Sequence, residues 1–444
     1  MTKSPTRRIP DLLPDLLPEL PQDLLPNLSL TSARALHLAA QGLLTPRRQP
    51  ATKQDVLQEI RSMSALQIDT ISVVARSPYL VLWSRLGHYP HTWLEELLEE
   101  GKIFEYWSHE ACFLPIEDYG WYRHQMISPH KMGWKYNQRW LSENQDQVTR
   151  VKQHIKKNGA TRSADFERTD GKAGGWWEWK PEKRALEVLF TTGDVMVARR
   201  HNFQRIYDLR ERVHPTWKDK QHLLSQQDCR QQQVVRAVRA LGIAKANWVA
   251  DYFRMAKLDQ RIHPETLAEQ GLLLRASVTG WEQPVYVHPD HAGLLERAAA
   301  GTLKATNTRI LSPFDPVVWD RKRAIELFGF DYKLECYTPV PKRQYGYFTL
   351  PILRNGALIA RMDAKAHRKE GRFEIKALHL EPGIRISQAL ANDIAKVVEE
   401  FASWHACKAI ETVYCNSEQL GALLEALLRT LPGALPETSM AVHF

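Results

Sequence analysis

The feature of this sequence that most constrains its fold is a series of helical patterns followed by a hairpin pattern in the middle of the chain. Apolar residues first recur at helical spacing and then at the spacing of strands. The expected elements are helices over 145–158, 162–166 and 182–192 and strands over 195–200 and 203–207. His201 and Asn202 join the two strands, so the hairpin has a basic tip. Helices followed by such a hairpin are typical of a winged helix-turn-helix unit.

Similar orders of elements are expected on both sides of this unit. The earlier segment has helices over 33–41, 54–65 and 79–86 and a strand from residue 66. The later segment has helices over 226–241, 245–253 and 264–269 and strands over 272–278 and 284–288. After residue 308 the pattern predicts strands over 345–350, 357–363, 372–379 and 410–414 and helices over 388–404 and 417–428.

These patterns predict an α+β fold class, with tandem winged helix-turn-helix units and a C-terminal domain that is β-rich, barrel-like and partly helical. The expected domains are a disordered proline-rich tail over 1–28, a first winged-helix-like unit over 29–140, a second winged helix over 141–215, a third over 216–305 and the C-terminal domain over 306–444. Proline recurs every three to five residues from Pro10 to Pro26 and forbids a continuous helix there. A peptide ligand for a partner is the alternative interpretation of the tail.

The segment 66–74 carries the best candidate for chemistry. Read as a strand, it places the carboxamide of Gln67 and the carboxylate of Asp69 on one face. A carboxylate in an otherwise apolar run must find a partner, meet solvent or do chemistry, because burying it alone is costly. The alternative is an aspartate at a strand end that accepts a hydrogen bond from a neighbouring backbone group.

The charge of the chain favours a polyanionic partner. Its 444 residues carry a formal net charge of +9. Five cysteines without a C-x-x-C pair indicate reduced thiols, and we expect a cytoplasmic protein. No apolar run reaches the ~18–20 residues of a membrane span, and no signal peptide is evident, so no membrane partner is expected.

Two clusters of basic side chains are candidates for contact with DNA. The first lies at the hairpin tip and its return strand, and the second follows a C-terminal strand and its turn. Their members are Arg199, Arg200 and Arg205 in the first cluster and Arg361, Lys365, His367 and Arg368 in the second. A solvated hairpin end is the alternative for the first cluster.

Several motifs together resemble one family. They are the runs 67–71, 76–79, 83–85, 105–111, 311–316, 319–321 and 361–368. These runs are similar to those of the winged-helix DNA glycosylases that unhook interstrand crosslinks, the YcaQ (AlkX) group, which are relatives of AlkZ. That group pairs Gln with Asp, as Gln67 and Asp69 do here, whereas AlkZ carries a second Gln at the position of Asp69. The resemblance extends from about Leu28 to the C-terminus.

The resemblance implies a monofunctional DNA glycosylase of base excision repair that acts on N7-alkylguanine, including guanine crosslinked to the opposite strand. An N7-alkylguanine is cationic and leaves as a neutral base, so the enzyme must stabilise a sugar cation and supply water. Asp69 would do the first and help deprotonate the water, which Gln67 would hold. Trp107 and His109 would support the site, although a hydrogen-bonded structural role is the alternative for His109. Arg76, in the second run, would contact the DNA.

Neither a metal nor a cofactor is expected. The 17 histidines include no H-E-x-x-H or similar ligand spacing, and the phosphate-binding and dinucleotide-binding glycine motifs are absent. The expected partner is double-stranded DNA with alkylated or crosslinked guanine, bound by a monomer that is nucleoid-associated when on DNA. A non-catalytic winged-helix transcription regulator is the alternative function, and it would give Gln67 and Asp69 no special role.

Overall fold

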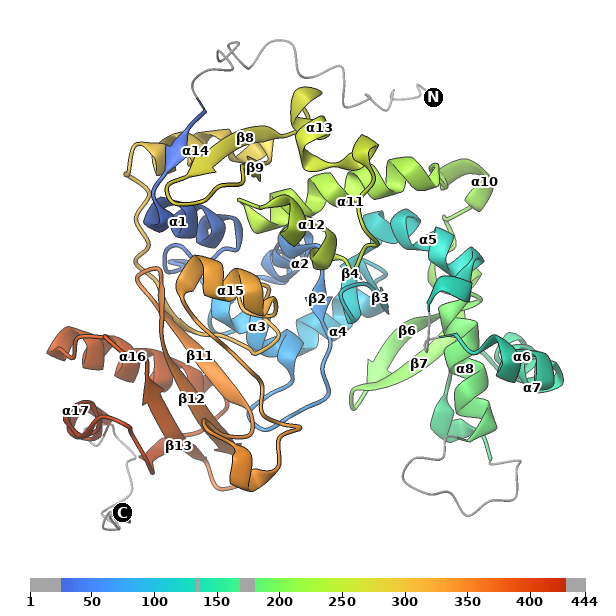
Figure 1. Cartoon of the computed structure of the whole chain (residues 1–444). Helices are drawn as coiled ribbons and strands as arrows, with labels where there is room; N and C mark the ends of the chain where they lie inside the picture. The colour runs from blue at the N-terminus through green and yellow to red at the C-terminus, as the bar shows by residue number, and fades with distance from the viewer. Residues whose placement is uncertain (1–24, 133–135, 168–179, 429–444) are drawn as a thin grey trace.

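A computed structural model describes residues 25–132, 136–167 and 180–428, and the chain has the predicted α+β class (Figure 1). Residues 1–24, which hold most of the expected tail, lie outside this description.

The predicted end of the tail at residue 28 is too late. Strand β1 (Asn27–Leu28) pairs in parallel with β8 (Leu274–Val278), and Leu28 is fully buried. The folded body therefore includes residues that the proline pattern had assigned to the tail, because their partner strand lies far along the chain.

The first part of the described chain builds a three-stranded sheet in the order β2-β4-β3. Its elements are α1 (Leu30–Ala40), α2 (Lys53–Met63), β2 (Leu66–Gln67), α3 (Ser77–Leu86), α4 (Thr92–Glu99), β3 (Ile103–Trp107) and β4 (Ala111–Pro115). Helix α2 begins with a capping box in which Thr52 and Asp55 each satisfy a backbone N–H of the other. Its apolar residues recur on one face and are buried, so it carries β2 to a fixed position.

The middle part forms the predicted hairpin and a second three-stranded sheet in the order β5-β7-β6. Its elements are η2 (Ile116–Asp118), α5 (Tyr119–Ile127), η3 (Pro129–Lys131), α6 (Gln138–Glu143), α7 (Gln145–Asn158), β5 (Thr161–Arg162), η5 (Ser163–Asp165), α8 (Pro181–Thr191), β6 (Val195–His201) and β7 (Gln204–Leu209). The helix expected over 162–166 is only the 3-10 turn η5. Asn202 and Phe203 close the hairpin with φ of 48° and 66°.

A third sheet has the order β1-β8-β9. The elements around it are α9 (Arg210–Val213), α10 (Asp219–His222), α11 (Gln226–Leu241), α12 (Ala246–Tyr252), η6 (Gln260–Ile262), α13 (Pro264–Glu269), β8, β9 (Val285–Val287), η7 (Pro289–His291) and α14 (Ala292–Ala299). The long helix α11 crosses the upper part of the molecule and lies beside elements of the other two parts (Figure 1).

The C-terminal part is a half-barrel sheet of five strands in the order β10-β11-β12-β13-β14. Its elements are β10 (Thr308–Ile310), α15 (Arg321–Phe328), η8 (Val340–Lys342), β11 (Thr349–Arg354), β12 (Ala357–His367), β13 (Arg372–Leu380), α16 (Gln388–Trp404), β14 (Ala409–Thr412) and α17 (Glu418–Leu428). The strand expected over 345–350 begins only at Thr349, because the preceding residues belong to a loop described below.

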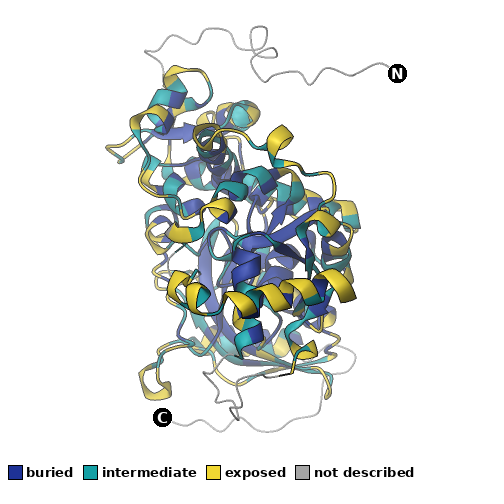
Figure 2. Cartoon of the chain, turned by 90° about the vertical axis from the view of Figure 1, so that its right-hand side faces the viewer, coloured by how far each residue is buried: buried dark blue, intermediate teal, exposed yellow. Residues whose placement is uncertain are grey.

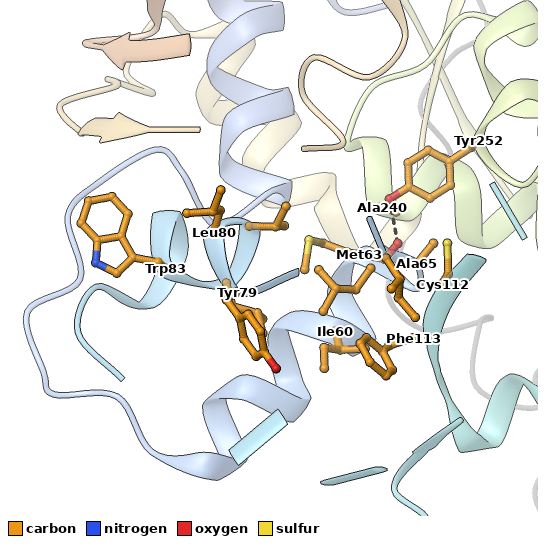
Figure 3. Packing of buried hydrophobic residues seen from close by; sticks show 14 of the residues in the cluster. Ile60, Met63, Ala65, Tyr79, Leu80, Trp83, Cys112, Phe113, Ala240 and Tyr252 are labelled. Atoms are coloured by element: carbon orange, nitrogen blue, oxygen red, sulfur yellow. Dashed lines mark hydrogen bonds between the residues drawn. The ribbon is translucent and has the colours of Figure 1, made fainter. Parts of the chain in front are cut away.

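Buried contacts join these parts into one body. The Tyr252 hydroxyl of α12 donates to the Met63 carbonyl at the end of α2, at 2.7 Å (Figure 3). Arg85 of α3 forms an ion pair with Asp315 at 2.5 Å, and neither side chain is exposed. Viewed from the side of α6–α8, exposed residues follow the outer helices and the strands behind them are buried (Figure 2). The Tyr252–Met63 hydrogen bond and the Arg85–Asp315 ion pair thus hold the segment between β2 and α3 near both of its ends.

Candidate active site

Gln67 and Asp69 lie where β2 leaves its sheet. Leu66 and Gln67 pair with β4, and the Ile68 N–H still donates to the Ala111 carbonyl at 2.7 Å. The chain then departs into a loop over 68–76, so the expected strand over 66–74 is much shorter than predicted. Asp69 is consequently not the next residue on the same strand face as Gln67. The two Cα atoms are still no more than about 7 Å apart, because two residues separate them.

The Asp69 carboxylate is partly buried in a tight local turn. Its Oδ1 accepts from the Ile71 N–H at 2.8 Å, which matches the backbone interaction weighed from the sequence. Burial raises the pKa of Asp69, and the Ile71 N–H opposes this by favouring the charged form. The turn engages one of the two carboxylate oxygens, so the structural and chemical interpretations of Asp69 are compatible.

The Gln67 side chain is more deeply placed than that of Asp69, with 7% of the residue exposed. Its Oε1 has no hydrogen-bond partner among the described residues. A buried amide oxygen without a partner is costly, and it is an acceptor for a water or another donor. Gln67 therefore offers a polar group at the base of the loop that carries Asp69.

Trp107 and His109 lie at the same end of this sheet. Trp107 ends β3 and pairs with Ala111, the residue whose carbonyl receives the Ile68 N–H. His109, in the β3–β4 turn, is 3% exposed and stacks on Trp319 with 4.2 Å between ring centroids. Burial lowers the pKa of His109 to about 3, so the ring is neutral at physiological pH. This geometry gives His109 a structural position at the edge of the site.

Two neighbouring hairpins contact the loop over 68–76. Arg368, in the β12–β13 turn, donates to the Val74 carbonyl. Arg76, at the start of α3, has its guanidinium 4.3 Å from the ring centroid of Phe203, which lies at the tip of the β6–β7 hairpin. Figure 1 shows the segment between β2 and α3 running between the two hairpins. The middle and C-terminal parts thus both help to position Asp69.

Arg200 and Arg205, both predicted to contact DNA, are paired with carboxylates of the protein in this structure. Both guanidinium groups pair with Glu105 of β3, whose side chain is fully buried, and the Arg200–Glu105 distance is 2.7 Å. Arg200 also covers the Phe203 ring at 4.3 Å, and Arg205 further pairs with Glu187. These charges are compensated inside the protein, where they attach the hairpin to the first sheet.

Two members of the C-terminal cluster are also used internally. Arg361, another predicted DNA contact, is 3% exposed, pairs with Glu381 at 2.7 Å and stacks on Tyr345 at 4.0 Å. His367 is hydrogen-bonded to Glu374 at 2.8 Å and faces β13 rather than open solvent. By contrast, Lys365 and Arg368 are exposed, and so is Arg199 in the first cluster.

Three residues that shape this region have only weak signals, or none, in the sequence. Glu105 and Phe203 hold the β6–β7 hairpin in place, and the only signals for them are an acidic residue in an aromatic strand and an apolar residue at a hairpin tip. Nothing in the sequence marks Tyr337. Burial raises the pKa of its neighbour Cys336 and Asp69 adds to this, while Cys336 and burial raise the pKa of Tyr337 and Asp69 makes a smaller contribution. The C-terminal loop that holds them is therefore part of the surroundings of Asp69.

Within 25–132, 136–167 and 180–428, no group of three or more His, Cys, Asp or Glu side chains is arranged to hold a metal ion. In the same ranges, no helix combines the length and apolarity that crossing a membrane requires.

Comparison with known proteins identifies the relatives of this arrangement. The model of a family described as AlkZ-like DNA glycosylases matches residues 60–404. Among solved structures, the Streptomyces sahachiroi DNA glycosylase AlkZ is similar, with a TM-score of 0.58 and 13% sequence identity, over 87% of this chain and 99% of that chain. At this identity the structural likeness concerns the fold, whereas the family model covers most of the chain. The match confirms the resemblance seen in the motifs and does not favour a non-catalytic regulator.

Proposed function

Because this chain belongs to the AlkZ-like DNA glycosylase family, and is therefore a DNA glycosylase, we propose that its substrate is N7-alkylguanine in double-stranded DNA. The proposal includes guanine that is tethered to the opposite strand. The position of Asp69 supports it most: a partly buried carboxylate in a turn, on a loop that two hairpins contact. Gln67 stands at the base of the same loop with an acceptor oxygen to offer.

The chemistry required of these groups is modest. N7-alkylated guanine already carries positive charge, so it departs with the electrons of the glycosidic bond as a neutral base and needs no general acid. The sugar is left as an oxocarbenium-like cation, which the negative charge of Asp69 would stabilise. A water then attacks the anomeric carbon while Asp69 accepts its proton and Gln67 orients it. Because water is the nucleophile, the enzyme would be monofunctional.

A tethered guanine cannot rotate freely into a closed pocket, which is the usual route of base-excising enzymes. Two open pockets of the described residues, of about 520 Å³ beside α12 and about 430 Å³ beside β7, are lined by residues other than Asp69. Its loop instead lies between two hairpins. We interpret the three helix-and-sheet parts as tandem winged helices that would hold the duplex by its backbone while Asp69 approaches the groove. Arg199, Lys365 and Arg368 are the exposed candidates for phosphate contacts.

Release of the base is the direct test of this proposal. Purified protein is incubated with duplexes that carry one N7-methylguanine, one nitrogen-mustard crosslink between guanines, or no damage. We expect free N7-alkylguanine, abasic sites without strand cleavage, and unlinked strands from the crosslinked duplex. Strand cleavage through a trapped Schiff base would contradict the monofunctional mechanism. Release of a different base, with none from either guanine lesion, would contradict the proposed substrate.

A further inference from the structure

We propose that Tyr337, at the tip of the loop over 335–346, enters the duplex beside the lesion and stacks on a base there. The loop would act as a wedge that separates the damaged nucleotide from its neighbour and brings it toward Asp69. The inference rests on the proposed function and adds a residue that positions the substrate. The tip is distinguished by its exposure, its rigidity, its location and its charge.

The tip presents apolar surface to solvent. Tyr337 is 90% exposed and Val340 is 69% exposed, more than the other exposed large hydrophobic residues of the described ranges. A tyrosine ring normally gains much of its stability from burial, and a single exposed ring by itself needs no explanation. Two such side chains on one loop tip, next to a candidate active site, indicate a surface that binds something apolar and flat.

The loop is held in place by the carboxylate of Glu335. This side chain accepts from the backbone N–H groups of Gln344, Tyr345 and Gly346, at 3.0, 2.8 and 3.2 Å. Burial acts to raise the pKa of Glu335, but these N–H groups outweigh it, and the pKa is lowered. Because the carboxylate joins the two ends of the loop, the tip is ordered before it meets a ligand and binding costs less entropy.

A second set of contacts fixes the far end of the loop against the sheet. Gly346 has φ of 131°, and a Cβ there would lie 2.3 Å from Oδ2 of Asp363 on β12. The same oxygen accepts from the Tyr347 N–H at 3.3 Å. The loop is thus carried by the hairpin whose turn donates to Val74, and this connects the wedge with the loop over 68–76.

The location of the tip follows from two observations. The first is the contact just described between the C-terminal hairpin and the loop that carries Asp69. The second is electrostatic: Cys336 and burial raise the pKa of Tyr337, and the Asp69 carboxylate raises it further, an effect that requires proximity. The hairpin contact and this electrostatic effect together place the tip on the side of the fold where the loop over 68–76 lies.

The charge around the tip suits DNA. Lys333 and Lys342 are exposed on either side of it. Arg343 is a third cation, and it donates to the Thr338 carbonyl at 2.9 Å within the same loop. An apolar tip flanked by cations fits a base stack between two phosphate backbones, where apolar side chains unstack neighbouring bases. A tethered guanine needs such local separation because it cannot leave the helix completely.

The test follows base unstacking separately from base release. A duplex with 2-aminopurine next to a tetrahydrofuran abasic-site analogue is titrated with wild-type protein and with Tyr337→Ala, Tyr337→Phe and Ile325→Ala. Ile325, on α15, is a matched control because it is a large apolar side chain that is 46% exposed. We expect a rise in fluorescence with the wild type, Tyr337→Phe and Ile325→Ala, and loss of most of that rise with Tyr337→Ala.

Single-turnover release of N7-methylguanine provides the second measurement. Tyr337→Ala should be slower by about tenfold, or ~1.4 kcal/mol, while Tyr337→Phe stays close to wild type because the ring and not the hydroxyl stacks. Equal fluorescence and equal rates for Tyr337→Ala and wild type would overturn the wedge and leave the proposed function intact. If the wild type released no N7-methylguanine, the proposed function would fail, and the fluorescence arm would still decide whether Tyr337 enters the duplex. Circular dichroism confirms that each variant is folded.

Discussion

The neighbouring residues Arg199 and Arg200 of β6 should respond oppositely to replacement by alanine. Arg200 has a side chain that is 5% exposed and is paired with a Glu105 carboxylate that is not exposed at all. Removing one partner of a buried ion pair typically costs 3–5 kcal/mol, because the remaining charge keeps its desolvation cost. Arg205 still faces Glu105 in the variant, so we expect the lower end, about 3 kcal/mol. Loss of the guanidinium from the face of Phe203 acts in the same direction.

Arg199 is exposed, and its replacement should leave the free energy of unfolding within about 0.5 kcal/mol of wild type. If it contacts a phosphate, the slope of log affinity against log salt should decrease by about one unit. The Arg200 variant should instead keep the wild-type slope under conditions where it is folded. Urea unfolding and fluorescence-anisotropy titrations at several salt concentrations measure the two quantities. A stable Arg200→Ala protein with a reduced salt slope would refute the structural assignment of Arg200.

Three further predictions concern the frame and the pH response. Asp315→Asn should lower the free energy of unfolding by roughly 3–5 kcal/mol, because its arginine partner is also fully buried, and a urea-measured loss below about 1 kcal/mol would contradict this. A variant that lacks residues 1–28 should be less stable than a variant that lacks only residues 1–24, by about 2 kcal/mol, because the longer deletion exposes the site that Leu28 fills. Equal melting temperatures of the two variants would show that β1 contributes nothing. Base release should decline as pH falls through the pKa of Asp69. Because burial raises that pKa in the folded protein, the decline should occur at higher pH than for an ordinary aspartate. A pH–rate profile whose acid limb lies at the ordinary value would contradict the burial of this group.

The elements that the sequence predicts well are those whose signals are local. Helix α16 runs over 388–404 as expected, since its apolar residues recur with helical spacing and Ser387 caps it. The predicted β6–β7 hairpin is also confirmed, because two strand patterns flank a short polar turn. The residues before Thr349 look like part of a strand in the sequence, but the N–H groups of Tyr345 and Gly346 donate to Glu335, which lies earlier in the chain and outside any local pattern.

At the candidate site, too, features with a local sequence signal could be predicted and features that depend on tertiary structure could not. The motif containing Gln67 and Asp69 could be found from the sequence, while the turn that removes Asp69 from the strand could not. Arg200 and Arg205 looked like DNA contacts because a basic hairpin tip is typical of a wing. Their partner Glu105 is about a hundred residues away in the sequence, at separations of 95 and 100 residues, so only the tertiary structure could pair them.

The central claim is that the charge of Asp69 drives base release, and Asp69→Asn tests it most directly because the variant keeps the shape and removes the charge. The measurement is single-turnover release of N7-methylguanine by folded protein, with binding to undamaged duplex and melting temperature as controls. We expect the rate to fall by orders of magnitude, since each ~1.4 kcal/mol of lost transition-state stabilisation costs about tenfold, while binding stays equal or improves slightly. A folded Asp69→Asn protein that releases the base at the wild-type rate would contradict the claim.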